Sequence, residues 1–238
     1  MVLGTADRLE NGRTLLGKFS NGMVDGILNT LPELDENEAQ KLAGGVPLIT
    51  YRRHRDAPLI IDFAAGTRTA LSYLNELGHR NIAIIPSDSR ARHGQADPCF
   101  AAYREQLDLS DIPVRVFQAP EGTIQAGYAI ADALFNSDAT AVLAGNDAVA
   151  AGLIQWAISR GIRLPERMSI IGHDDSPLAA MTFPPLTSLR LPIGPIAAHT
   201  VQVLMHAIDP AEAMPEALVL IPELIIRNST SPVSSATN

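Results

Sequence analysis

The chain has little cysteine and little positive charge, and both shortages exclude classes of protein. Cys99 is the single cysteine among 238 residues, so neither an internal disulfide framework nor a cysteine-rich zinc site can form. Lys and Arg number 18 against 26 Asp and Glu, which gives a formal net charge of −8. Because binding to nucleic acid phosphates needs clustered Lys and Arg, this acidic balance argues against nucleic acid binding by this stretch.

Long apolar runs, targeting signals and catalytic motifs are also missing. No apolar run reaches the length of about 18 residues that a membrane span needs, and residues 1–13 lack the basic start and apolar core of a signal peptide. The nucleophile elbow, the phosphate-binding loop, the dinucleotide-binding turn and the zinc-protease helix do not occur. We therefore expect a soluble, cytoplasmic chain that is not an enzyme and holds neither a metal nor a cofactor.

Short apolar runs and amphipathic stretches alternate along most of the chain. The runs are nearly continuous in apolar residues, which is typical of parallel strands covered on both faces. Gly78 and Gly161 follow two of the amphipathic stretches, as glycines at helix C-termini do. The alternation predicts an α/β fold with parallel sheets and right-handed crossovers. The predicted strands are 24–29, 47–51, 59–63, 81–86, 114–118, 141–145, 168–172, 187–191 and 218–227, and the predicted helices include 67–77, 147–160 and 195–208.

Polar clusters follow three of the predicted strands. In open α/β sheets, ligands bind beyond the carboxyl ends of the strands. Carboxylates, an amide and a guanidinium at such positions can bind a polyhydroxyl ligand. The alternative is structural, with Asp147 capping the next helix and Asp175 satisfying a turn. The clusters are 87–92 (SDSRAR), then Asn146 with Asp147, and finally His173 with Asp174 and Asp175.

The remaining reactive residues have structural interpretations. His173 beside two aspartates lacks a third spaced ligand, so we interpret the cluster as a hydrogen-bonded strand end rather than a metal site. Cys99 has no His or Asn at motif distance, which argues against a nucleophile. His79, directly after Gly78, is expected to bond the carbonyls of the preceding helix.

Five ordered segments resemble the ligand-binding core of the lactose-repressor (LacI) family of transcriptional regulators. Each motif is weak alone, but the ordered set is specific and covers roughly residues 1–230. The segments are VDGILNT at 24–30, LNELGHRNIAII at 74–85, AVLAGNDAVAAGLIQWAISRGIRLPERMSIIGHDD at 141–175, PPLTSLRLP at 184–192 and PELIIRNST at 222–230.

The resemblance implies a two-lobe, type I periplasmic-binding-protein-like fold. Each lobe would be a doubly wound parallel sheet flanked by helices, and a small effector, sugar-like or nucleoside-like, would lie between the lobes. Family members are regulators, often repressors, in which the effector changes the affinity of a helix-turn-helix for operator DNA, and a homodimer is expected. The expected N-terminal lobe is 1–79 with 191–217, the C-terminal lobe is 80–190 with 218–230, and the disordered tail is 231–238.

By the same resemblance, Asn146 and Asp174 match effector-contacting residues of the family. Cys99 stands where the family often has an arginine, and Arg90 or Arg92 is expected to substitute for it. The helix-turn-helix and the first strand and helix of the core are expected to be absent, which would leave the first lobe incomplete. Two alternatives remain open at this point, a solute-binding protein of a transporter and a truncated, non-functional fragment.

Overall fold

The computed structural model describes residues 9–20, 22–29, 34–50, 59–86, 102–103, 105 and 115–233. The chain divides into two compact units. The first comprises Met1–Ile61 and Ile193–Leu220, and the second comprises Asp62–Pro192 and Ile221–Asn238. The chain therefore passes between the units three times.

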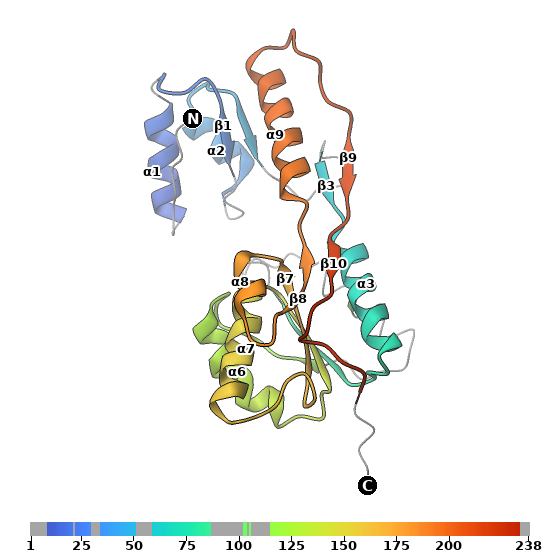
Figure 1. Cartoon of the computed structure of the whole chain (residues 1–238). Helices are drawn as coiled ribbons and strands as arrows, with labels where there is room; N and C mark the ends of the chain where they lie inside the picture. The colour runs from blue at the N-terminus through green and yellow to red at the C-terminus, as the bar shows by residue number, and fades with distance from the viewer. Residues whose placement is uncertain are drawn as a thin grey trace. The chain divides into compact units, whose positions relative to one another are not determined.

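A six-stranded sheet forms the centre of the second unit (Figure 1). Its strand order is β10-β8-β7-β6-β4-β5, and every neighbouring pair is parallel except β10 with β8. The alternating pattern thus predicted the parallel sheet correctly. The strands are β4 (Ile82–Ile85), β5 (Arg115–Val116), β6 (Ala141–Ala144), β7 (Ser169–Asp174), β8 (Thr187–Arg190) and β10 (Glu223–Ile225).

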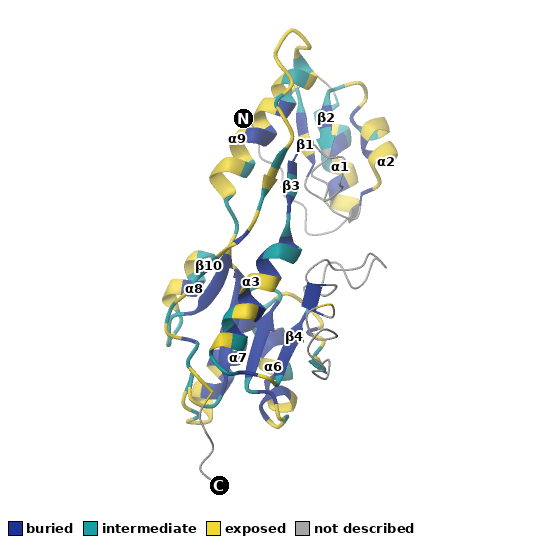
Figure 2. Cartoon of the chain, turned by 90° about the vertical axis from the view of Figure 1, so that its right-hand side faces the viewer, coloured by how far each residue is buried: buried dark blue, intermediate teal, exposed yellow. Residues whose placement is uncertain are grey.

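Helices cover both faces of this sheet. Ile82 and Ile84 of β4 pack with α3 (Phe63–Glu76) in one apolar cluster, whereas Ala83 and Ile85 pack with α6 (Ile124–Phe135) and α7 (Asp147–Ser159) in another. Because successive side chains of a strand point to opposite faces, a strand covered on both sides must be apolar throughout. Figure 2 shows the buried strands, with exposed residues on the outer faces of these helices.

The backbones of helices α6 and α7 are in direct contact. A Cβ atom at Gly127 would lie 2.1 Å from the Val149 carbonyl oxygen, and one at Gly152 would lie 2.1 Å from that of Ile124. The two glycines are therefore required by the packing and not by backbone conformation. This contact fixes the start of α7 beside the start of α6.

The first unit contains two parallel strand pairs among its described residues. The pair β1 (Ile27–Asn29) and β2 (Leu48–Thr50) is separate from the pair β3 (Leu59–Ile61) and β9 (Leu218–Leu220). The helices are α1 (Leu9–Phe19), α2 (Glu36–Leu42) and α9 (Ile193–Ile208). The small apolar core consists of Leu16, Ile27, Leu34, Ala39, Ala43 and Leu48.

The observed division between the units differs from the predicted boundaries at residues 79 and 218. Helix α3 belongs to the second unit because its apolar stripe, Ala70, Leu71 and Leu74, is buried against that unit's sheet. The predicted strand 218–227 is two strands, β9 in the first unit and β10 in the second, separated at Pro222. Proline has no N–H to donate to a ladder, so the strand ends there.

The segment predicted as a disordered tail is ordered at its start. The Val233 N–H donates to the Leu77 carbonyl at 2.9 Å, and the Ser231 N–H donates to the Ser169 hydroxyl at 3.1 Å. These bonds join residues 231–233 to the end of α3 and to β7. The remaining tail, 234–238, lies outside the described residues.

The buried His79 side chain helps to hold this segment. As expected, the His79 backbone N–H donates a hydrogen bond to the Leu74 carbonyl of α3. The His79 ring makes different contacts, with residues next to the sheet. Nδ1 lies 2.9 Å from the Thr140 hydroxyl, and Nε2 lies 3.0 Å from the Ser231 carbonyl, so Nε2 carries the proton and donates it. Burial lowers the pKa of His79 from its ordinary value of 6.5.

We predict that His79→Ala lowers the free energy of unfolding by about 2 kcal/mol, because buried partners of the ring lose their hydrogen bonds. The lowered pKa means that the unfolded chain binds a proton more readily. Wild-type stability should therefore decline as the pH falls through 6.5, and the variant should show a weaker decline. Urea denaturation of both proteins between about pH 8 and pH 5 measures this, and parallel curves would contradict the role given to the ring.

Candidate functional site

The second and third predicted clusters meet at the carboxyl edge of the second unit's sheet. Strands β6 and β7 are parallel neighbours, so Asn146 and Asp174 belong to adjacent strand ends. Three other predicted effector residues, Arg90, Arg92 and Cys99, lie outside the described residues, as does the rest of the 87–92 cluster.

Asn146 is the N-cap of α7. Its Oδ1 accepts the Val149 N–H at 2.8 Å, and its Nδ2 donates to the Gly122 carbonyl at 3.1 Å. Asn146 therefore fills the capping role that the structural interpretation gave to Asp147. An amide has two N–H donors and two acceptor lone pairs, so one of each is left over for a ligand.

Asp147 is instead a buried acceptor, with only 2% of its surface exposed. Its Oδ2 accepts the Ser176 N–H at 2.6 Å and the Ser176 hydroxyl at 2.9 Å, and its Oδ1 accepts the Ser188 hydroxyl at 2.6 Å. Burial raises the pKa of Asp147, and the serine hydrogen bonds oppose that rise. One carboxylate thus ties the start of α7 to the loop after β7 and to β8.

The two aspartates after Gly172 have left-handed backbones, with φ of 98° at Asp174 and 48° at Asp175. The Asp175 side chain is only 4% exposed, and its Oδ2 accepts from Arg190 Nε at 2.7 Å. A second guanidinium, that of Arg227, lies 2.6 Å from Oδ1. Asp175 is therefore held by ion pairs, beyond the turn interaction predicted for it, whereas Asp174 is exposed.

His173 lies at the same strand end. Its ring meets the Phe63 ring edge-on, with 5.5 Å between the centroids, and the residue is buried. Within the described ranges, no group of three His, Cys, Asp or Glu side chains is placed to hold a metal ion.

Four residues of this network were not singled out from the sequence: Ser176, Ser188, Arg190 and Arg227. All four reach the aspartates from the loop after β7, from β8 or from the segment after β10. Ser188 and Arg190 lie on a strand that was predicted, but no spacing rule indicates which carboxylate a serine or arginine on another strand will meet. Only the observed strand order supplies that information.

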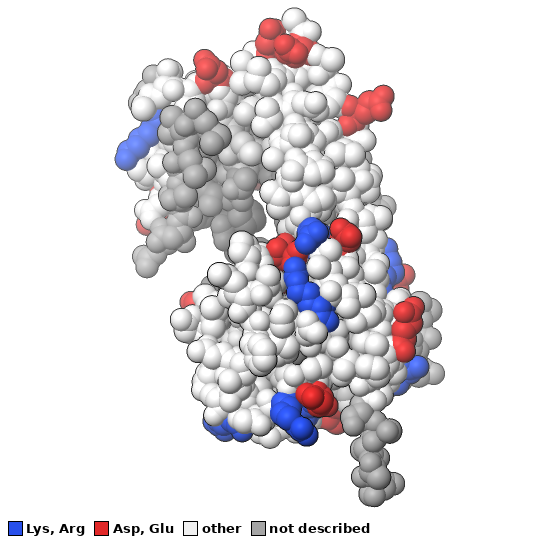
Figure 3. Space-filling view, in the orientation of Figure 1, with Lys and Arg blue, Asp and Glu red and all other residues white. Residues whose placement is uncertain are grey.

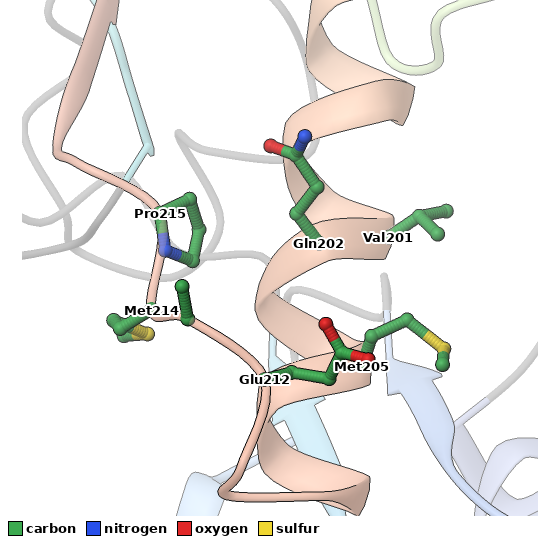
Figure 4. A pocket seen from close by; sticks show the side chains of 7 residues that line it. Val201, Gln202, Met205, Glu212, Met214 and Pro215 are labelled. Atoms are coloured by element: carbon green, nitrogen blue, oxygen red, sulfur yellow. The ribbon is translucent and has the colours of Figure 1, made fainter.

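A surface groove of about 420 Å³ lies on the first unit, between α9 and the segment that follows it (Figure 4). Of the predicted effector residues that the structure describes, neither Asn146 nor Asp174 lines it. Its walls are largely apolar, with Gln202 and Glu212 as the polar members. The lining residues are Val201, Gln202, Met205, Glu212, Ala213, Met214 and Pro215.

Charged side chains of both signs are interspersed on the face drawn in Figure 3, where the described Lys and Arg residues form no continuous basic area. This distribution agrees with the acidic composition. In the part of the chain that the structure describes, no helix combines the length and the apolar character needed to cross a bilayer.

We predict that Asp147→Asn lowers the free energy of unfolding by about 1–3 kcal/mol, because an amide cannot accept all three hydrogen bonds. A raised pKa in the folded state means that wild-type stability declines as the pH rises above the ordinary value of 3.8. The amide of the variant does not titrate. The difference in the free energy of unfolding between the two proteins should therefore shrink as the pH rises from about 4 to about 7. Denaturation midpoints at several pH values measure it, and a constant or growing difference would be inconsistent with a raised pKa.

Comparison with known proteins identifies the family. The model of the periplasmic binding protein-like domain matches residues 71–230, more than half of the chain. The HTH-type transcriptional regulator MalR of Streptomyces coelicolor is 33% identical over 197 residues, which are 79% of this chain and 57% of MalR. The chain thus spans little more than half the length of that relative.

Solved structures agree with this assignment. A LacI family transcriptional regulator from Enterococcus faecium with bound ribose has 25% identity and a TM-score of 0.83, over 98% of this chain and 88% of that one. The complex of the transcriptional regulator CelR with cellobiose has 27% identity and a TM-score of 0.79, over 96% and 73%. The chain belongs to the periplasmic binding protein-like domain family, and the proteins it is similar to include LacI family transcriptional regulators.

Proposed function

We propose that the chain is the effector-sensing part of a LacI-type transcriptional regulator and that it binds a sugar through Asn146 and Asp174. One observation carries the proposal, namely an exposed carboxylate and a partly used amide on adjacent strand ends of the sheet. Two similar regulators were solved with ribose and with cellobiose, which supports a polyhydroxyl ligand.

The chemistry of the two groups suits hydroxyls. An ionised carboxylate only accepts hydrogen bonds, so Asp174 would accept from sugar O–H groups. The Asn146 amide both donates and accepts, so it can bind a hydroxyl in either sense. Both groups sit on elements fixed by β pairing and by the contact of α6 with α7, so little ordering is needed when the ligand binds.

Regulation requires that the effector favours one conformational state over another, since equal affinity for both states would change nothing. We propose that operator DNA is bound by a helix-turn-helix outside the 238 residues, in line with the HTH-type names of relatives such as MalR. In this role the chain is a sensor rather than an enzyme, and it works in the cytoplasm, where the operator is.

We further propose that the chain forms a homodimer. Met181 and Phe183, at the end of α8 (Pro177–Met181) and just after it, are 80% and 81% exposed, and large apolar side chains at such exposure favour burial against a partner. Sedimentation velocity tests this, with a dimer expected for the wild type and a shift toward monomer for Phe183→Ser. A monomeric wild type, or an equal dimer in the variant, would count against it.

We predict that Asp174→Asn abolishes the thermal stabilisation that a bound sugar gives. Asparagine has the same shape and tolerates the left-handed backbone of this position, so the fold should be kept. A sugar at 100 times its dissociation constant should stabilise the wild type by ~2.7 kcal/mol. Thermal shift with a panel that includes ribose and cellobiose measures the effect.

The matched control is Asp132→Asn, which changes an exposed aspartate on α6 that hydrogen-bonds Asn136. This variant should respond to the sugar as the wild type does. The site assignment fails if Asp174→Asn keeps the wild-type response. The effector proposal itself fails if no sugar in the panel stabilises the wild type.

A further inference from the structure

The side-chain amide of Asn146 is held at both ends by backbone groups of opposite character. Its Oδ1 accepts the Val149 N–H at 2.8 Å, and its Nδ2 donates to the Gly122 carbonyl at 3.1 Å. A backbone N–H only donates and a carbonyl only accepts. An amide turned by half a rotation would place its nitrogen against the N–H and its oxygen against the carbonyl. These two contacts therefore allow a single orientation of the amide.

Residue 122 must lack a side chain for the amide to lie in this position. A Cβ atom at Gly122 would be 2.6 Å from Asn146 Nδ2, whereas nonbonded heavy atoms pack at about 3.5 Å or more. The nitrogen would have to move by about 1 Å, which disturbs the hydrogen bonds of the amide. The φ of Gly122 is outside the left-handed region, so this glycine is required by the close contact and not by its own backbone conformation.

The helix after Gly122 holds it beside the start of α7. Thr123, the next residue, is the N-cap of α6. The backbones of α6 and α7 are in contact at Gly127 and Gly152, and Asn146 is the N-cap of α7. The Gly122 carbonyl and the Asn146 amide are therefore carried by two helix starts that are packed together.

We propose that Gly122 is a positioning residue of the effector site, which orients the Asn146 amide through its carbonyl and through its lack of a side chain. The inference rests on the proposed function of Asn146. With the amide fixed, one N–H of Nδ2 and one lone pair of Oδ1 remain for the effector. Their positions determine where a bound hydroxyl accepts and where it donates, so Gly122 contributes to the choice of sugar without contacting it.

Gly122→Ala tests this, with Gly17→Ala as the matched control. Gly17 lies in α1, where an added Cβ would be in open space, and neither glycine has a positive φ. Calorimetric titration uses the sugar of the panel that stabilises the wild type most. The affinity should be about tenfold weaker for Gly122→Ala, as expected when one hydrogen bond to the ligand is lost. Gly17→Ala should bind as the wild type does, and circular dichroism shows whether each variant is folded.

The amide itself gives a readout that a general loss of stability would not produce. The side-chain NH₂ of Asn146 gives a pair of signals in a nitrogen–proton correlation NMR spectrum, assigned by their absence from the spectrum of Asn146→Ser. Gly122→Ala should shift this pair, because the hydrogen bond to the carbonyl changes, and Gly17→Ala should leave it in place. An unshifted pair in Gly122→Ala would mean that the methyl group does not move the amide, and would overturn the proposal.

A double variant shows whether Gly122 acts through the amide. Asn146→Ser keeps a good N-cap residue but removes the amide, so it should bind the sugar more weakly than the wild type. Adding Gly122→Ala to Asn146→Ser should cause no further loss, because the group that the glycine orients is no longer there. A further loss of about tenfold would mean that residue 122 meets the ligand directly, which contradicts the positioning role.

The outcomes separate this inference from the proposed function. If the wild type binds a sugar and Asn146→Ser binds it more weakly, the proposed function of Asn146 stands. Wild-type affinity in Gly122→Ala then overturns the positioning role alone. If the wild type binds no sugar, or if Asn146→Ser binds it equally well, the proposed function of Asn146 fails and the positioning role falls with it.

Discussion

The buried carboxylate of Asp147 is the constraint on which the candidate site depends. It accepts three hydrogen bonds from Ser176 and Ser188, which offset the cost of removing an acidic group from water. Because Asp147 opens α7, and α7 contacts α6 through Gly127 and Gly152, the helical layer and the loop after β7 are held together. The ends of β6 and β7 therefore form one rigid edge.

Among the described residues of this edge, some stabilise the structure and others are placed to contact a ligand. The buried carboxylate of Asp147 accepts hydrogen bonds, and the buried carboxylate of Asp175 forms ion pairs. Both carboxylates therefore have partners within the protein. Asp174 is exposed beside them, and Asn146 serves both purposes, as a helix cap with polar groups left over. Such an edge suits reversible binding of hydroxyl groups, which needs fixed acceptors and donors.

Most strands of the second unit could be predicted from the sequence, because continuous apolar runs indicate strands that are covered on both faces. The glycines at 78 and 161 have the positive φ expected after helices. Helix α6 was not predicted, and its Gly127 serves a backbone contact with α7 that sequence periodicity does not indicate. The partners of Asp147 lie 29 and 41 residues away, so its role depends on strand order. Arg90, Arg92 and Cys99 remain predictions.

Hydrogen–deuterium exchange with and without a bound sugar tests the central claim most directly, because it locates the ligand without any substitution. We expect slower exchange on sugar binding at the start of α7, around Asn146, and from the end of β7 to Ser176. Protection confined to α9 and the groove beside it, with none at these two strand ends, would contradict the account.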